Sequence, residues 1–180
     1  MIGGLRALCL GLALLAGFAP PARAMPAVGE RAPRFALRPL QDNTVLVSSK
    51  RLFEGQTTLV SFFATWCKPC KQEIPELKIL AERYADRGFR VVLVCLDQLG
   101  VREVARYLEE AGSGELQVLW DRYGRTREAY AVGQLPTNVL VGPDETVRLA
   151  WEMFQPEKLA ELDALLEQLP RPAEPGADGG

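Results

Sequence analysis

The stretch "FFATWCKPCKQEIP", residues 62–75, carries Cys67 and Cys70 in a CxxC arrangement, between an aromatic run and a segment with helical spacing of its apolar residues. A cysteine pair with this spacing can serve as a redox couple, as half of a metal site or as a structural bridge. These three uses need different residues elsewhere in the chain. The remaining sequence therefore helps to distinguish between them.

The residues that a metal site would need are missing from the sequence. The 180 residues include no histidine, and the two other cysteines, Cys9 and Cys95, do not form a second CxxC pair. A structural zinc site takes four cysteine or histidine ligands. The sequence therefore indicates no metal site, and the lack of histidine also excludes Ser-His and Cys-His catalysis.

A structural bridge is a poor explanation of the pair as well. A disulfide that closes so short a ring removes little chain entropy from the unfolded state, so it adds little stability. The alternative stays open at this point, but a redox couple explains the spacing better.

The first 24 residues, "MIGGLRALCLGLALLAGFAPPARA", have the pattern of a secretory signal peptide. Arg6 precedes an apolar run, and Ala22-Arg23-Ala24 forms a small-x-small cleavage triplet. We expect cleavage after Ala24, or retention of residues 1–24 as a membrane anchor. An exported, periplasmic protein lies in a compartment where disulfides persist. Cys9 leaves with a cleaved peptide, and the three remaining cysteines allow at most one internal bridge.

The size and composition of the chain fit one globular domain. The whole chain of 180 residues has 48% hydrophobic and 24% charged residues, and the segment 25–169 is long enough for a core of its own. The last residues, 170–180, are rich in Pro, Gly and Ala and are predicted to be disordered. The formal charge is -2 and no basic cluster is visible, so we expect no binding to nucleic acid.

Strands and helices alternate along this domain. The run "TTLVSFFA" is a continuous stretch of apolar, β-branched and aromatic residues, which suits a central strand that is buried on both faces. A leading β-hairpin is expected near 35–37 and 44–47. Further strands are predicted at 57–64, 89–97, 116–120, 137–142 and 146–153, and helices at 48–53, 68–84, 101–112, 122–132 and 156–169. The order predicts an α/β fold with a mixed central sheet flanked by helices.

Three features together resemble the TlpA/ResA-like family of exported thiol:disulfide oxidoreductases in the thioredoxin superfamily. They are "FFATWCKPC" after a buried strand, "QLPTNVLVGPDETV" at 134–147, and the leading hairpin. The resemblance implies a thioredoxin-like fold and a redox-active Cys67–Cys70 disulfide that needs no bound cofactor. It also implies that Cys67 is the exposed attacking thiol and that Cys70 resolves the mixed disulfide.

The same resemblance assigns roles around the pair. Pro136 is expected to be cis and to face the cysteines, although composition alone favours a trans bond. Together with Leu135 and Thr137 it would present backbone groups to an extended client protein. Trp66 would be a partly exposed cover of the site. The resemblance also implies that the segment from about Leu99 to Gln117 corresponds to an insertion of the family.

The chemistry of the predicted helix start supports these roles. Cys67 falls at a helix N-terminus, where free N–H groups and the helix dipole favour a thiolate. Lys68 adds a positive charge, and Pro69 stiffens the turn. Cys70 lies one turn along and points inward, as suits a resolving thiol. The residues next to the pair are therefore candidates for contact with the client.

Glu73 is the candidate general base. It follows Cys70 by three residues and shares its helix face, and its burial would raise its pKa. In the wider thioredoxin family an aspartate on the preceding strand is associated with this task, and Ser61 stands at that position here. The alternative is a solvated glutamate without a role. Cys95, within "VVLVCLD", is expected to be a buried core residue.

The predicted activity is reduction of disulfides in exported proteins, for example in cytochrome c or metalloprotein maturation. The partners would be a disulfide-containing client and a membrane electron donor of the thiol-transfer type. Exported oxidants of this superfamily usually carry a histidine between the cysteines and a large helical insertion, and both are missing here. The alternatives are a non-enzymatic binding module with this fold and a peroxiredoxin, which would need a lone peroxidatic cysteine.

Overall fold

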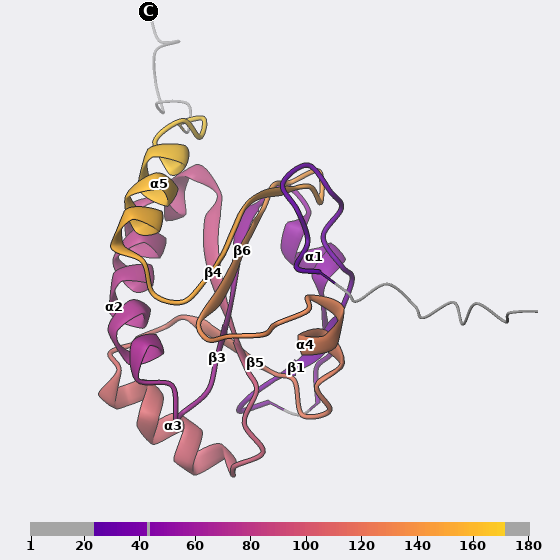
Figure 1. Ribbon diagram of the computed structural model, residues 1–180, viewed down its shortest axis with the longest axis vertical. Coiled ribbons are helices and arrows are strands. Elements are labelled where there is room, and N and C mark those ends of the chain that lie inside the picture. Colours follow the sequence, from indigo (N-terminus) through magenta and orange to yellow (C-terminus); the bar gives the residue numbers. More distant parts are fainter. Residues whose placement is uncertain (1–23, 43, 172–180) are drawn as a thin grey trace, which may run out of the picture.

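The computed structural model describes residues 24–42 and 44–171 (Figure 1). The predicted signal peptide up to Arg23 and the predicted tail from 172 onward lie outside these residues. The strands are β1 (Ala36–Pro39), β2 (Val47–Ser48), β3 (Thr57–Phe63), β4 (Phe89–Cys95), β5 (Gln117–Trp120), β6 (Thr137–Val141) and β7 (Val147–Glu152). The helices are α1 (Ser49–Phe53), α2 (Lys68–Arg83), the 3-10 turn η1 (Ala85–Arg87), α3 (Val101–Glu110), α4 (Arg125–Ala129) and α5 (Pro156–Leu166). None of the described helices has both the length and the apolar character needed to cross a membrane.

The seven strands form one mixed sheet in the order β2-β1-β5-β4-β3-β6-β7. Strand β3 lies near the centre, parallel to β4 and antiparallel to β6. All seven residues of β3 are buried, as its apolar, β-branched and aromatic sequence predicts. The mixed central sheet expected from the order of elements is confirmed.

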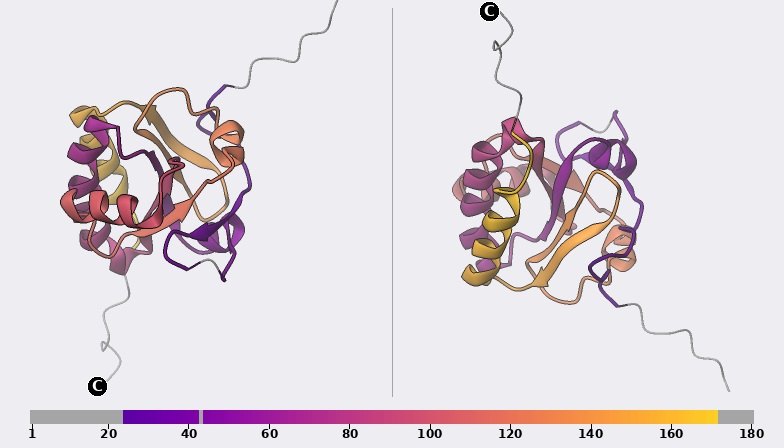
Figure 2. Two further views of the ribbon diagram at one scale, coloured as in Figure 1. Left: turned by 90° about the horizontal axis from the view of Figure 1, so that it is seen from below. Right: turned by 90° about the horizontal axis from the view of Figure 1, so that it is seen from above.

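Helices cover both faces of the sheet (Figures 1 and 2). Alternate residues of β3 point to opposite faces, so Leu59 and Phe63 join the core beneath α2, α3 and α5. Val60 and Phe62 join the second core, on the side of α1. The resulting three layers of helix, sheet and helix have the thioredoxin-like architecture that the resemblance implied.

The predicted N-terminal hairpin is present, with shorter strands that begin and end elsewhere. Strands β1 and β2 pair antiparallel, and Ala36 lies opposite Ser48. The far end of β1 continues into a pairing with β5, where Arg38 lies opposite Trp120. Val45, predicted to be in the second strand, is exposed and outside it. The hairpin is therefore an antiparallel edge on the central sheet.

Candidate active site

The two cysteines of the CxxC pair form a disulfide at the start of α2. The bond joins Cys67 and Cys70, with an S–S length of 2.03 Å and Cα atoms 5.3 Å apart. Cys67 is the N-cap residue of α2, and its Sγ accepts a hydrogen bond from the backbone N–H of Cys70 at 3.2 Å. Free N–H groups and the helix dipole at this position favour negative charge on the sulfur of Cys67. The helix start thus supports a thiolate at Cys67 when the pair is reduced.

The burial of the pair differs from the expectation of an exposed Cys67. In the disulfide form Cys67 is 4% exposed and Cys70 is 1% exposed. The expected exposure is therefore wrong for this state, because the N-cap position turns the sulfur toward the helix and its bonded partner. The exposed positions are those beside it: Trp66 is 72% exposed, and Lys68 and Pro69 are also exposed.

The loop before Cys67 is held by two residues that the sequence reasoning did not single out. Asp97 accepts hydrogen bonds from the backbone N–H of Thr65 at 2.7 Å and from its hydroxyl at 3.2 Å. The Tyr107 hydroxyl donates to the carbonyl oxygen of Cys67 at 3.2 Å. The sequence could have indicated Asp97. This residue follows the buried strand β4, which runs parallel to β3, so both strands end at the same edge of the sheet.

The distal proline reaches the same edge of the sheet. The Leu135–Pro136 peptide bond is cis, as the resemblance implied. Thr137 pairs with Phe62, so Pro136 lies beside the end of β3, where the chain turns toward Cys67. The Thr137 side chain is fully buried, whereas Leu135 is partly exposed. The backbone of Leu135 forms no hydrogen bond with the described residues, which leaves its N–H and C=O free for a ligand.

Glu73 is buried beneath the pair. It is 1% exposed, and the Nδ2 of Asn138 donates to both of its carboxylate oxygens, at 3.0 and 2.9 Å. Burial raises the pKa of Glu73 to about 7, and the hydrogen bonds from Asn138 act in the opposite direction. The alternative of a solvated glutamate is therefore wrong. Sequence reasoning missed Asn138, whose only signal was a polar residue inside the apolar run "NVLV".

Cys95 forms no bond with the Cys67–Cys70 pair. It is a free cysteine with no exposed surface in the middle of the core beneath α2. Burial raises the pKa of its thiol to about 12, so it stays protonated at neutral pH. The prediction of a core residue is confirmed.

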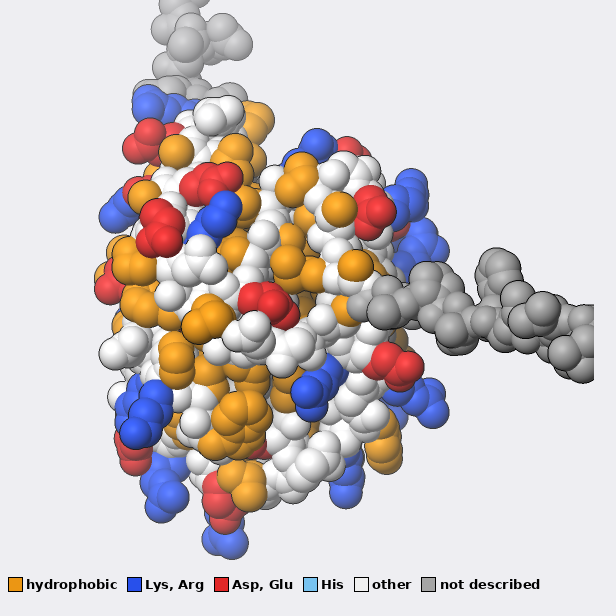
Figure 3. Space-filling model, in the orientation of Figure 1, with side chains coloured by type: hydrophobic (Ala, Val, Ile, Leu, Met, Phe, Trp, Pro, Cys, Tyr) orange, Lys and Arg blue, Asp and Glu red, His pale blue; other side chains and the backbone are white. Residues whose placement is uncertain are grey.

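Hydrophobic side chains gather in the lower middle of the face shown in Figure 3, around the place where β3 passes into α2 in Figure 1. Lys and Arg side chains lie on either side of this area. Trp66 is one of the most exposed hydrophobic residues of the described chain. A surface of this kind beside a reactive pair suits contact with another protein.

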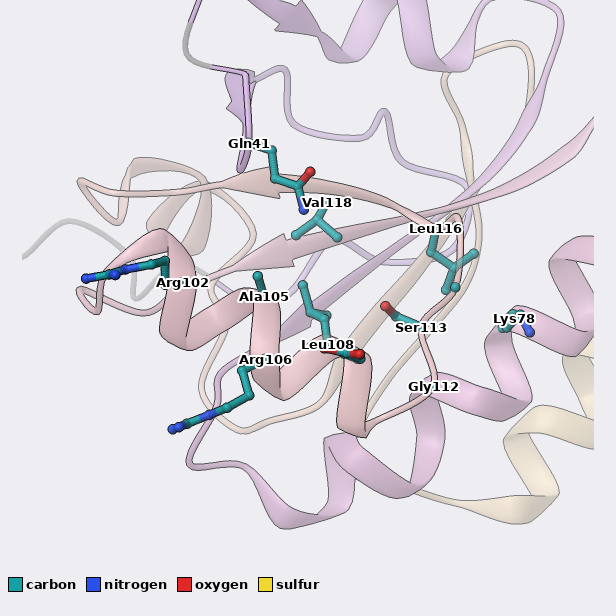
Figure 4. A pocket seen from close by; sticks show the side chains of 12 residues that line it. Gln41, Lys78, Arg102, Ala105, Arg106, Leu108, Gly112, Ser113, Leu116 and Val118 are labelled. Carbon is teal, nitrogen blue, oxygen red and sulfur yellow. The ribbon is translucent and has the colours of Figure 1, made fainter.

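A separate hollow of about 730 Å³ lies between α3 and β5 (Figure 4). Its lining includes Leu108, Leu116 and Val118 but neither cysteine of the pair. Arg102 and Arg106 point away from it in Figure 4. The hollow is therefore separate from the disulfide, and neither cysteine lines it.

Taken together, the fold and the site define a class of protein. A disulfide at the junction of a central strand and a helix, next to a cis proline and above a buried carboxylate, can exchange with other thiols and disulfides. These features are those of a thioredoxin-fold thiol:disulfide oxidoreductase.

Comparisons with known proteins agree with this class. The model of the AhpC/TSA family matches residues 28–150. Thiol-disulfide oxidoreductase ResA of Oceanobacillus iheyensis is 31% identical over 121 residues, which cover 65% of this chain and 60% of that relative. ResA of Geobacillus thermodenitrificans is 30% identical over 139 residues, which cover 77% of this chain and 76% of the relative. The chain therefore spans less than two thirds of the first of these relatives and about three quarters of the second.

Solved structures give the same result. The crystal structure of a putative thiol:disulfide interchange protein DsbE from Chlorobium tepidum superimposes with a TM-score of 0.68 at 30% identity, over 78% of this chain and 96% of that one. The chain belongs to the AhpC/TSA family, among its ResA-like thiol-disulfide oxidoreductases.

Proposed function

We propose that this protein reduces disulfide bonds in exported client proteins, with Cys67 as the attacking thiol and Cys70 as the resolving thiol. The observation that carries the proposal is the hydrogen bond from the backbone N–H of Cys70 to the Sγ of Cys67 at the start of α2. This contact stabilises negative charge on one sulfur of the pair. The attacking sulfur of a thiol exchange is the thiolate.

The reaction proceeds in two exchanges. The Cys67 thiolate attacks one sulfur of the client disulfide, and the second client sulfur leaves as a thiolate that takes a proton from water. The Cys70 thiol then gives its proton to a base and attacks the sulfur of Cys67, which releases the first client sulfur as a thiolate. The client disulfide gains two electrons and the Cys67–Cys70 dithiol loses two. The disulfide form in the structure corresponds to the product of this sequence.

Glu73 is the proposed base for the second exchange. Its carboxylate lies on the helix face that it shares with Cys70, and its pKa of about 7 lies close to a neutral working pH. A carboxylate with this pKa accepts a proton from Cys70 and returns it when the disulfide is reduced again. The same group therefore serves both directions of the cycle.

The client would bind in an extended conformation across the edge of the sheet. The free backbone N–H and C=O of Leu135, next to Pro136 and Thr137, can pair with a client strand. The exposed side chains of Trp66, Lys68 and Pro69 would contact the client on the other side of the pair. Clients of the proposed kind include apocytochrome c and metalloproteins under assembly.

The proposal also covers the location and the electron source. Residues 1–24 would direct export and then be cleaved or stay as a membrane anchor, residues 25–169 would form the thioredoxin-like domain, and residues 170–180 would be a disordered tail. A periplasmic dithiol must be recharged, because its surroundings are oxidising. The donor would be a membrane protein that passes electrons outward by thiol transfer.

The test is turnover with a disulfide-bonded protein such as insulin, with dithiothreitol as the electron source. We expect the wild-type domain to accelerate insulin reduction, Cys67→Ser to abolish this activity, and Cys70→Ser to accumulate a mixed disulfide. Equal insulin reduction with and without the wild-type protein would favour a non-enzymatic binding module. Faster consumption of hydrogen peroxide than of insulin would favour the peroxiredoxin alternative.

A further inference from the structure

We propose that Asn138 is a positioning residue for thiol–disulfide exchange, which holds Glu73 in both of its protonation states. Its Nδ2 donates to the carboxylate, and its Oδ1 is available to accept from the carboxylic acid. This inference rests on the proposed function, because it concerns the residue that we propose as the base. The proposal adds Asn138 of β6 to the site, a residue that follows Glu73 by 65 positions in the sequence.

The sheet fixes Asn138 directly beneath the helix. On β6 it pairs with Ser61 of β3 on one side and with Trp151 of β7 on the other. Residues that are paired across strands point to the same face, and Trp151 belongs to the core beneath α2. Asn138 has no exposed surface, and its Nδ2 reaches both carboxylate oxygens of Glu73. The sheet therefore holds the Asn138 side chain in position, and its one charged hydrogen-bond partner is the carboxylate of Glu73.

One end of this amide has no partner in the described structure. The Oδ1 of Asn138 is buried and accepts no hydrogen bond, and the indole N–H of Trp151 is buried and donates none. Buried polar atoms without partners are uncommon, since each costs free energy. When Glu73 takes up a proton it becomes a donor, and a half-turn of the amide presents Oδ1 as its acceptor. The unpaired atom is thus the one that the protonated state needs.

Among the described residues, no charged side chain is one of the influences on the pKa of Glu73. The side chains that act on it are Asn138 on β6 and Trp151 on β7, and neither carries a charge. Burial is the largest influence on the pKa of Glu73, and Asn138 is the largest influence that opposes it. The indole of Trp151 acts in the same direction as Asn138, although its geometry falls short of a hydrogen bond.

Two variants test the inference. Asn138→Leu removes the donor and the acceptor at similar volume, and Asn138→Asp keeps the shape but places a second carboxyl group beside Glu73. Loss of hydrogen bonds to a carboxylate raises its pKa, by about one pH unit for contacts of this kind. Two carboxyl groups at one site raise the pKa of one of them further. We expect Asn138→Leu to move the titration of Glu73 upward, and the coupled carboxyl pair in Asn138→Asp to lose its second proton at a still higher pH.

Two readouts are needed. A ¹³C NMR titration of the Glu73 carboxyl in the oxidised protein reports its pKa without any turnover. The rate at which the reduced protein is oxidised by glutathione disulfide, measured against pH, reports the reaction. The matched control is Thr58→Val, which removes a buried 2.8 Å hydrogen bond to Leu52 from the opposite face of β3 and should move neither curve.

The outcomes separate this inference from the proposed function. An upward shift of both curves in the Asn138 variants, and no shift in Thr58→Val, supports the inference. Unchanged curves in both Asn138 variants, when Glu73→Gln does alter the rate profile, overturn the inference and leave the role of Glu73 intact. If Glu73→Gln leaves the rate profile unchanged, the base assignment and the inference both fall.

Discussion

Replacement of Glu73 by glutamine should increase the stability of the protein relative to the wild type as the pH rises. The buried carboxyl has a pKa of about 7, against an ordinary value of 4.5. Below pH 4.5 the group is protonated in the folded and unfolded states alike. As the pH rises from 4.5 to 7, the unfolded chain releases the proton first, so the folded state loses stability relative to it. Above pH 7 the full cost of a buried charge is present.

The magnitude follows from the difference between the two pKa values. A rise of about 2.5 pH units corresponds to about 3 kcal/mol at 1.36 kcal/mol per unit. A glutamine side chain does not titrate and has nearly the same shape. The free energy of unfolding of Glu73→Gln, minus that of the wild type, should therefore increase by about 3 kcal/mol between pH 4 and pH 8. Subtraction removes the contributions of all other titrating groups, because these groups are the same in both proteins.

Urea unfolding of the two oxidised proteins at about pH 4, 6 and 8 measures this quantity. A constant offset between them reflects the altered hydrogen bonds to Asn138 and does not affect the argument. A difference that stays constant over the whole range would show that Glu73 titrates as an ordinary surface glutamate. That result would refute both its raised pKa and the reasoning from its burial.

Three further predictions concern the surroundings of the pair. Cys95 should resist iodoacetamide at pH 8 in the folded oxidised protein and react only after unfolding, because its thiol is buried with a pKa of about 12; rapid labelling would contradict this. Tyr107→Phe should lower the free energy of unfolding in urea by about 1 kcal/mol, since it loses the bond to the carbonyl of Cys67, and no loss would make that contact irrelevant. Glu110→Gln breaks an exposed ion pair with Lys71 and should leave the unfolding midpoint unchanged; a clear decrease would show that this pair matters.

The sequence patterns predicted most of the fold because they report local burial. The run at β3 consists of apolar, β-branched and aromatic residues with one serine, and the observed strand is buried at every position. The helix predicted at 48–53 is present as α1, and the Ser48 hydroxyl caps it by accepting from the backbone N–H of Arg51. The hairpin strands were less well placed, because β1 takes part of its pairing from β5, a contact that no local pattern reveals.

The site was predicted where its residues follow one another along one helix, and it was missed where its contacts depend on distant strands and helices. Cys67, Cys70 and Glu73 lie within seven consecutive residues, so helical spacing relates them. Asn138 and Tyr107 come from elements far along the chain, and their contacts follow only from the sheet order and the packing of α3. The low exposure of Cys67 also depends on its bonded geometry, which spacing alone does not determine.

The reduction potential of the Cys67–Cys70 pair tests the central claim most directly. Equilibration of the purified domain with glutathione buffers of defined ratio, followed by quantification of the free thiols, gives this potential. A reductase that is recharged by a membrane donor should have a potential below roughly −200 mV. A value near the strongly oxidising potential of about −120 mV would contradict the account, since such a pair would accept electrons from its clients.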